Sequence, residues 1–316
     1  MQIFLPMSFS HLRLLRICRR LGYSVCFLLL VGMVFSQLGC FSFRTPDADW
    51  DARFATRGQA LPPRFLDAVA PDGRRIHAAY VSAADHLPLL VFVHGSPGSA
   101  DNFWTYLADT NLSRRVRMVS IDRPGFGYTE GFGKAERSIP AQAAAVKAVV
   151  DSLSPDHPVV LFGHSLGAPV IARFAMDYPV RTAGLVLIGG SVDPALEPNA
   201  WWEPVIAAPP FRWILPRAFT ASNDEIRALE DELEDMKSFW SGVRCPVLLL
   251  HAVNDRLVPV GNVDFVRRML PDSNCVTTWV YPEGDHFFLW TKPDKVLTPL
   301  NQFLDRLTVE EAWAKY

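Results

Sequence analysis

The stretch VVLFGHSLGAP, residues 159–169, gives the clearest indication of the fold. It begins with β-branched and other apolar residues, which are typical of a strand buried in a sheet. These lead directly into Gly163-His164-Ser165-Leu166-Gly167, and the sequence that follows is typical of a helix. The two glycines allow a sharp turn that presents the serine hydroxyl above the sheet edge, so Ser165 is a candidate nucleophile. The alternative is an ordinary residue that caps the helix.

The composition limits what such a serine can belong to. The chain has 316 residues, of which 49% are hydrophobic and 20% charged. A chain of this length and composition can bury the core of one α/β domain of about 250 residues with short appendages. Its formal net charge is −2, and the part expected to fold has no long basic tract. We therefore expect a small-molecule substrate and no nucleic-acid partner.

Strands and helices alternate from Arg64 onward. Residues 64–81 predict a hairpin that turns at Asp72-Gly73. Helices are predicted over 138–153, with Ser138 as the N-cap, and over 260–270. Six apolar runs predict strands buried on both faces, at 87–95, 116–122, 157–163, 183–189, 245–252 and 275–281. This order predicts a mostly parallel central sheet flanked by helices, with a core formed by residues 64–190 and 243–316.

Residues 191–242 interrupt the alternation. They begin with a segment rich in Trp and Pro and continue into a helical stretch in which Ser222 and Glu225 have the spacing of a capping box. We expect a small helical cap over the carboxyl ends of the strands, the alternative being a decoration far from any site. Four aromatic residues of this cap are candidates for an acyl pocket or for structural packing: Trp201, Trp202, Phe211 and Trp213.

Two further residues complete a candidate catalytic set with Ser165. Asp255 follows one predicted strand and His286 follows the next, so the chain order is Ser, Asp, His. Asp193, which follows the preceding strand, is the rival acid. The backbone N–H groups of Ser96 and Leu166 are the candidates for an oxyanion hole.

The sequence resembles the α/β-hydrolase superfamily over roughly residues 64–308. The motifs HGSPGS, DRPGFGYT and GHSLG carry this resemblance together with the Asp255 and His286 loops, and they look like the branch of esterases, epoxide hydrolases and proline iminopeptidases. The resemblance implies the α/β-hydrolase fold and a cis peptide at Ser96-Pro97. A serine at position 165, instead of aspartate, disfavours epoxide opening and dehalogenation. Ser96, in place of a second glycine, and the small cap disfavour peptide cleavage.

The implied activity is that of a serine hydrolase which cleaves a carboxylic ester of a small apolar substrate. Ser165 attacks the carbonyl carbon, His286 accepts its proton and Asp255 orients the imidazole. No cofactor or metal is expected. Hydrolysis of lactones or carbon–carbon bonds and aminopeptidase activity are variants of the same chemistry, and a catalytically silent fold used for binding is the alternative from another class.

The first 45 residues predict export or membrane anchoring. Four arginines, at positions 13, 16, 19 and 20, precede 23 residues without charge, residues 21–43. Gly39-Cys40 resembles the end of a bacterial lipoprotein signal, so Cys40 is a candidate lipidation site; an uncleaved anchor helix, ordinary cleavage and a misassigned start are the alternatives. Except with a misassigned start, the enzyme would be membrane-associated or exported, in the bacterial periplasm or cell envelope, with residues 46–63 as a polar tether.

The cysteines of the body are Cys245 and Cys275. None of the cysteines has the spacing of metal ligands, so no zinc site is predicted. Because both residues open neighbouring predicted strands, a disulfide between them is one alternative, but its geometry across parallel strands is poor. The sequence leaves this pairing open.

Overall fold

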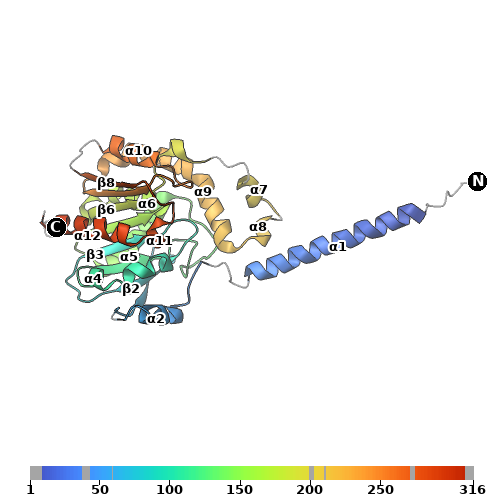
Figure 1. Ribbon diagram of the computed structural model, residues 1–316, viewed down its shortest axis with the longest axis horizontal. Coiled ribbons are helices and arrows are strands. Elements are labelled where there is room, and N and C mark those ends of the chain that lie inside the picture. Colours follow the sequence, from blue (N-terminus) through green and yellow to red (C-terminus); the bar gives the residue numbers. More distant parts are fainter. Residues whose placement is uncertain are drawn as a thin grey trace, which may run out of the picture.

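The protein is described by a computed structural model, which covers residues 9–37, 43–58, 60–198, 203–209, 211–270 and 275–309. One eight-stranded sheet runs through the body in the order β1-β2-β4-β3-β5-β6-β7-β8 (Figure 1). Only β2 runs against its neighbours, so the sheet is mostly parallel, as predicted. The strands are β1 (Arg64–Val69), β2 (Arg75–Val81), β3 (Leu89–Val93), β4 (Arg117–Ile121), β5 (Val159–His164), β6 (Thr182–Ile188), β7 (Val247–Ala252) and β8 (Val276–Tyr281).

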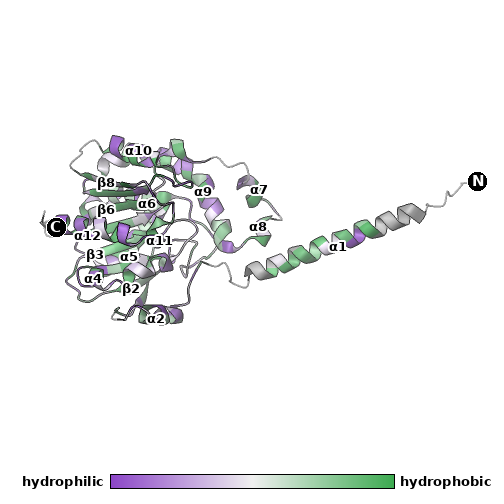
Figure 2. Ribbon diagram, viewed as in Figure 1, coloured by the Kyte–Doolittle hydropathy of each residue, from purple (hydrophilic) through white to green (hydrophobic). Residues whose placement is uncertain are grey.

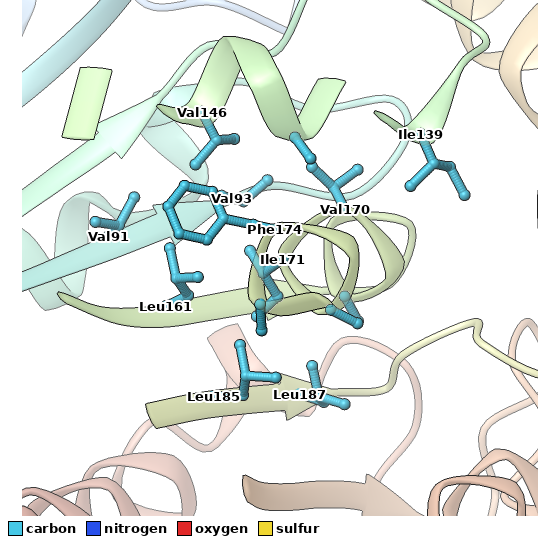
Figure 3. Close-up of a cluster of buried hydrophobic side chains, with 14 of the residues drawn as sticks. Val91, Val93, Ile139, Val146, Leu161, Val170, Ile171, Phe174, Leu185 and Leu187 are labelled. Carbon is cyan, nitrogen blue, oxygen red and sulfur yellow. The ribbon is translucent and has the colours of Figure 1, made fainter. Parts of the chain in front are cut away.

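Helices cover both faces of the sheet because the central strands are apolar on both sides. Alternate residues of a strand point to opposite faces, so Val91 packs on one face and Phe92 on the other. The first face lies under α5 (Ile139–Leu153), α6 (Gly167–Asp177) and α10 (Gly261–Met269), and Figure 3 shows the side chains of α5 and α6 meeting β3, β5 and β6. The second face lies under α2 (Asp47–Ala55), α3 (Trp104–Leu107), α4 (Thr110–Ser113), α11 (Phe288–Thr291) and α12 (Asp294–Val309).

The local predictions are confirmed where turn and cap residues specify the backbone. Strands β1 and β2 form the predicted hairpin, and Gly73 has a φ of 85° in its turn. The side chain of Ser138 accepts a hydrogen bond from Ala141 N and caps α5. Two short 3-10 helices complete the body: η1 (Ala100–Phe103) and η2 (Pro179–Arg181), and η3 (Pro194–Leu196) opens the inserted segment.

The insertion between β6 and β7 is helical, but its long helix begins earlier than predicted. It contains η3, α7 (Glu203–Ala207), α8 (Phe211–Ile214), α9 (Arg217–Met236) and η4 (Lys237–Gly242). The predicted capping box is wrong, because Ser222 and Glu225 lie within α9, and Pro216 occupies the N-cap position. The carboxylate of Glu225 binds groups of the body instead of the start of its own helix.

Part of the segment predicted as a polar tether, residues 46–63, is a helix packed against the body. Residues 47–55 form α2, and its side chains Trp50 and Phe54 are buried against the second face of the sheet. Trp50 lies 5.7 Å from Phe65 of β1 between ring centroids. Since two large aromatic side chains are removed from water, this part of the chain belongs to the packed body.

The N-terminal helix α1 (Phe9–Gln37) projects away from the body (Figure 1), and hydrophobic residues dominate its second half (Figure 2). Its C-terminal part lies beside α8. Among the residues that the structure describes, no helix combines the length and apolar character needed to cross a membrane. Cys40 lies outside the described residues.

Cys245 is a buried thiol and forms no disulfide. Burial raises the pKa of this thiol to about 12, so it is protonated at neutral pH. The disulfide with Cys275 that the sequence left open is thus absent from the described structure, as the state of Cys245 shows.

Candidate active site

Ser165 lies in the sharp turn between β5 and α6. Its φ of 54° is a left-handed conformation that non-glycine residues rarely adopt. Its backbone N–H donates to Ile188 O of β6 at 2.9 Å, which holds the turn at the carboxyl edge of the sheet. The flanking glycines are required by space, since a Cβ on Gly163 would lie 2.5 Å from Gly167 O and one on Gly167 would lie 2.2 Å from Val93 O.

His286 and Asp255 form a buried pair at the same edge. The Nδ1 of His286 lies 2.7 Å from Asp255 Oδ2 and donates to it, so Nε2 is left as the proton-accepting nitrogen. The other carboxylate oxygen accepts from the backbone N–H groups of Leu257 and Val258 at 2.9 and 2.8 Å. Burial by itself raises the pKa of Asp255, but the hydrogen bond and charge of His286, with these N–H groups, hold it below its ordinary value. Asp255 is therefore ionised at neutral pH.

Two contacts bring this pair next to Ser165. A Cβ on Gly189, the residue after Ile188, would lie 3.4 Å from both Asp255 Oδ2 and His286 Nδ1. His164, the residue before Ser165, donates from Nε2 to the carbonyl of His286 at 3.2 Å, and the two rings are 4.7 Å apart between centroids. The loops after β5, β6, β7 and β8 thus meet at one point above the sheet.

The loop after β3 supplies the fourth part of the site. A Cβ on Gly95 would lie 2.8 Å from the Cβ of Ser165, so the backbone of this loop passes directly beside the serine. The Ser96-Pro97 peptide is cis, as expected. Within the described residues, the backbone N–H groups of Ser96 and Leu166 have no hydrogen-bond acceptor. Both are therefore available to a ligand atom beside Ser165.

A buried polar network behind this loop was missed in the sequence. Arg123, which follows β4, has no exposed surface, and it forms an ion pair with Glu225 of α9 at 2.7 Å. Gln142 of α5 bonds to both, and Ser96 Oγ donates to Glu225 Oε2 at 2.7 Å. The spacing of residues on α9 could have indicated this network. Glu225 precedes the buried Leu229 and Leu233 at intervals of four, which places an acidic residue on the buried face of the helix.

The structure separates Asp193 from His286, and it leaves the predicted acyl pocket open to test. Asp193 lies 3.4 Å from Arg268 Nη2 and accepts from Ala195 N, whereas Asp255 holds His286. Phe211 and Trp213 are on α8 with 51% and 60% of their surface exposed, so the structure does not enclose them in a pocket, and their role in acyl binding stays a prediction. Trp201 and Trp202 lie outside the described residues.

Known proteins share this architecture. A family model described as the alpha/beta hydrolase fold matches residues 88–241. The proposed carbamate hydrolase RutD of Escherichia coli K12 is 27% identical over 241 residues, covering 66% of this chain and 87% of that protein. The structure of a proposed aryl esterase from Burkholderia cenocepacia matches with a TM-score of 0.63 and 21% identity, covering 78% of this chain and 100% of the other. A membrane phospholipase A, described as a bacterial virulence factor, matches with a TM-score of 0.62 and 19% identity, covering 93% and 98%. The two structural matches establish a common fold.

Proposed function

The chain belongs to the α/β-hydrolase superfamily and is a hydrolase, and from this premise we propose that it is a serine hydrolase acting on carboxylic esters of small apolar acids. One observation carries the proposal. The Asp255–His286 pair, 2.7 Å apart, lies beside a serine held at a φ of 54° at the end of β5. A base oriented by a buried carboxylate next to a strained serine favours nucleophilic catalysis.

In the proposed acylation step, the Oγ of Ser165 attacks the ester carbonyl carbon. His286 Nε2 takes the hydroxyl proton, and the Asp255 carboxylate stabilises the imidazolium that forms. The carbonyl oxygen becomes an oxyanion, to which the N–H groups of Ser96 and Leu166 donate. Collapse of the tetrahedral intermediate breaks the carbon–oxygen ester bond, and the alcohol leaves with the proton from His286.

In the proposed deacylation step, water attacks the acyl-enzyme carbonyl. His286 accepts a proton from the water and then returns it to Ser165, which releases the acid. The residues of the site supply a nucleophile, a base, its orienting acid and two donors, which is the set that acyl transfer to water requires.

The surroundings of Ser165 support the proposed substrate class. The ring of His164 lies 4.7 Å from that of His286 and 5.0 Å from that of Trp290 between centroids, and burial lowers the pKa of His164 to about 3, so His164 adds no charge beside the catalytic pair. Uncharged surroundings favour an apolar acyl group. Likeness to the proposed carbamate hydrolase makes a small carbamate the second substrate to test, because its carbonyl is attacked in the same way.

The proposal is tested by active-site labelling and by hydrolysis. We expect a fluorophosphonate probe to label the purified full chain and to label Ser165→Ala not at all, since the probe reacts with an activated serine. The control variant Ser152→Ala removes an exposed hydroxyl of α5 and should label like the wild type. Absence of wild-type labelling between about pH 6 and pH 9 would contradict the proposal.

A series of p-nitrophenyl esters then defines the acyl group. We expect short to medium chains to be hydrolysed faster than long ones, and a p-nitrophenyl carbamate of similar size provides the comparison. Turnover of long-chain lipids alone, or of peptides alone, would contradict the proposed substrate class.

We also propose that the N-terminus directs the enzyme to the bacterial cell envelope. The arginines and the uncharged stretch that precede Cys40 support this proposal. The site itself does not depend on it, because Ser165, Asp255 and His286 all lie in the body.

A further inference from the structure

One acidic side chain of the insertion, Glu225, packs into the body and is almost completely buried. Glu225 of α9 is 2% exposed, and its carboxylate accepts four hydrogen bonds. Three come from Arg123 and Gln142, at 2.7, 3.2 and 3.1 Å, and the fourth comes from Ser96 Oγ at 2.7 Å. A buried carboxylate without partners would cost several kcal/mol, so these four donors explain why this one is tolerated.

Arg123 uses its remaining N–H groups on the loop after β3. Its Nε donates to His94 O and its Nη2 to Gly95 O, both at 2.8 Å. Gly95 O also accepts from His94 Nδ1 at 2.6 Å, while Arg123 N donates to His94 Nε2 at 3.0 Å. Two consecutive carbonyl groups of this loop are therefore fixed by donors from Arg123 and His94.

The peptide bond between Gly95 and Ser96 links these contacts to the site. In a planar trans peptide the C=O and the N–H point in opposite directions. Because the Gly95 carbonyl is held on the side of Arg123 and His94, the Ser96 N–H points the other way. The bond from Ser96 Oγ to Glu225 fixes the same residue from its side chain.

We propose that Glu225 is a positioning residue that aims the Ser96 N–H at the oxyanion, by holding Ser96 Oγ directly and the Gly95 carbonyl through Arg123. This inference rests on the proposed function, in which that N–H stabilises the tetrahedral intermediate. Since Glu225 belongs to the insertion and Ser96 to the body, the alignment of the donor depends on α9 being seated against the loop. The inserted segment therefore contributes to the rate of the chemical step as well as covering the body.

The first test compares two charge-neutralising variants of neighbouring residues on α9. For Glu225→Gln we expect kcat for a p-nitrophenyl ester to fall about 10- to 100-fold, less than the 10²- to 10³-fold typical of a deleted oxyanion donor, with KM within about threefold. Asp224→Asn is the control, because Asp224 pairs with Arg212 at 2.8 Å within the insertion. It should keep the wild-type kcat. Equal kcat values for Glu225→Gln and wild type would overturn the proposal.

The second test uses a double-mutant cycle, since a merely structural role would not couple to Ser96. Ser96→Ala removes the side-chain contact and keeps the N–H, so we expect a smaller fall in kcat, roughly three- to tenfold, in a variant that still folds. The double variant should lose no more activity than Glu225→Gln alone. Additive losses would overturn the proposal, and if Glu225→Gln does not fold, an unchanged kcat of Ser96→Ala would do so.

The labelling rates distinguish a failure of this inference from a failure of the proposed function. If the wild type reacts with the fluorophosphonate at Ser165 and Glu225→Gln reacts equally fast, the positioning role fails and the serine mechanism stands. If the wild type does not react, the mechanism itself fails. We expect labelling of Glu225→Gln at Ser165 at a rate reduced by about the same factor as kcat.

Discussion

Three histidines, His94, His164 and His286, lie in the segments around Ser165, and burial keeps the first two neutral. Burial and the charge of Arg123 hold the pKa of His94 well below its ordinary value, and both of its ring nitrogens are engaged. Burial and the neighbouring His286 lower the pKa of His164 to about 3. Both rings are therefore neutral at physiological pH and place no competing positive charge beside His286. Because Asp255 is ionised, a proton arriving on His286 is stabilised.

At the residue scale, the choice between the two candidate acids is testable. Asp255→Asn should lower kcat by about 10⁴-fold, because the amide cannot hold the imidazole in the tautomer that leaves Nε2 free. Asp193→Asn should change kcat by less than about threefold, since Asp193 contacts Arg268 and not His286. Steady-state hydrolysis of one ester by both variants provides the measurement. A larger loss in Asp193→Asn than in Asp255→Asn would reverse the assignment.

At the scale of elements, α2 is fastened to the loop that supplies Arg123. Asp47 at the start of α2 lies 3.5 Å from His77 Nε2 of β2, and His77 Nδ1 lies 2.9 Å from Asp122 Oδ2, one residue before Arg123. Burial by itself lowers the pKa of His77, but the hydrogen bond and charge of Asp122, with the charges of Asp47 and Asp67, raise it above 6.5. When it is protonated, the ring thus bridges two carboxylates.

This raised pKa predicts how stability depends on pH. Because the folded pKa is above the unfolded value, the stabilisation is fully present below about pH 6.5 and is lost as the pH rises through the folded pKa. The free energy of unfolding of the wild type, measured in urea, should therefore fall more steeply between about pH 6 and pH 8 than that of His77→Gln. His86→Gln, at an exposed position, should follow the wild type. Parallel curves for wild type and His77→Gln would refute the bridge.

At the scale of the whole molecule, the body starts close to the proposed lipidation site. Arg44 already contacts the body, with Nη1 donating to Gly127 O at 3.0 Å and its guanidinium 4.7 Å from the Tyr128 ring centroid. Only residues 41–43 separate Arg44 from Cys40. A lipid on Cys40 would therefore hold the enzyme next to the membrane surface, whereas a long tether would let it move away.

The prediction is that Cys40→Ala, expressed as the full chain in a bacterial host, loses membrane retention and the mass increment of acylation. Cys26→Ala is the matched control, because Cys26 lies within α1 and outside the lipoprotein-like motif. Fractionation and mass spectrometry of the wild type and both variants provide the readout. Unchanged retention of Cys40→Ala, with residues 1–39 still attached, would show an anchor helix in place of lipidation.

Much of the fold was predictable because it is specified locally. The period of apolar residues gives the strands, Asp72-Gly73 gives the hairpin turn, and Gly163 and Gly167 give the turn that holds Ser165. The strands and the hairpin turn depend on neighbours within a few residues, through the alternation of a strand and the backbone freedom of Gly73. The Gly-x-Ser-x-Gly spacing is also local, although Gly167 is needed because Val93 O of another strand lies against it.

The strand order along the chain, the turn at Ser165 and the candidate acids and base could all be predicted from the sequence. The folded chain was needed to show that Asp255 and not Asp193 meets His286, that Glu225 binds Ser96 and Arg123 instead of capping its helix, and that α2 packs on the sheet. The physical reason is that a buried charge takes the partners which packing brings within hydrogen-bond distance. Those partners lie up to 129 residues away, as Ser96 does from Glu225, and local sequence carries no record of them.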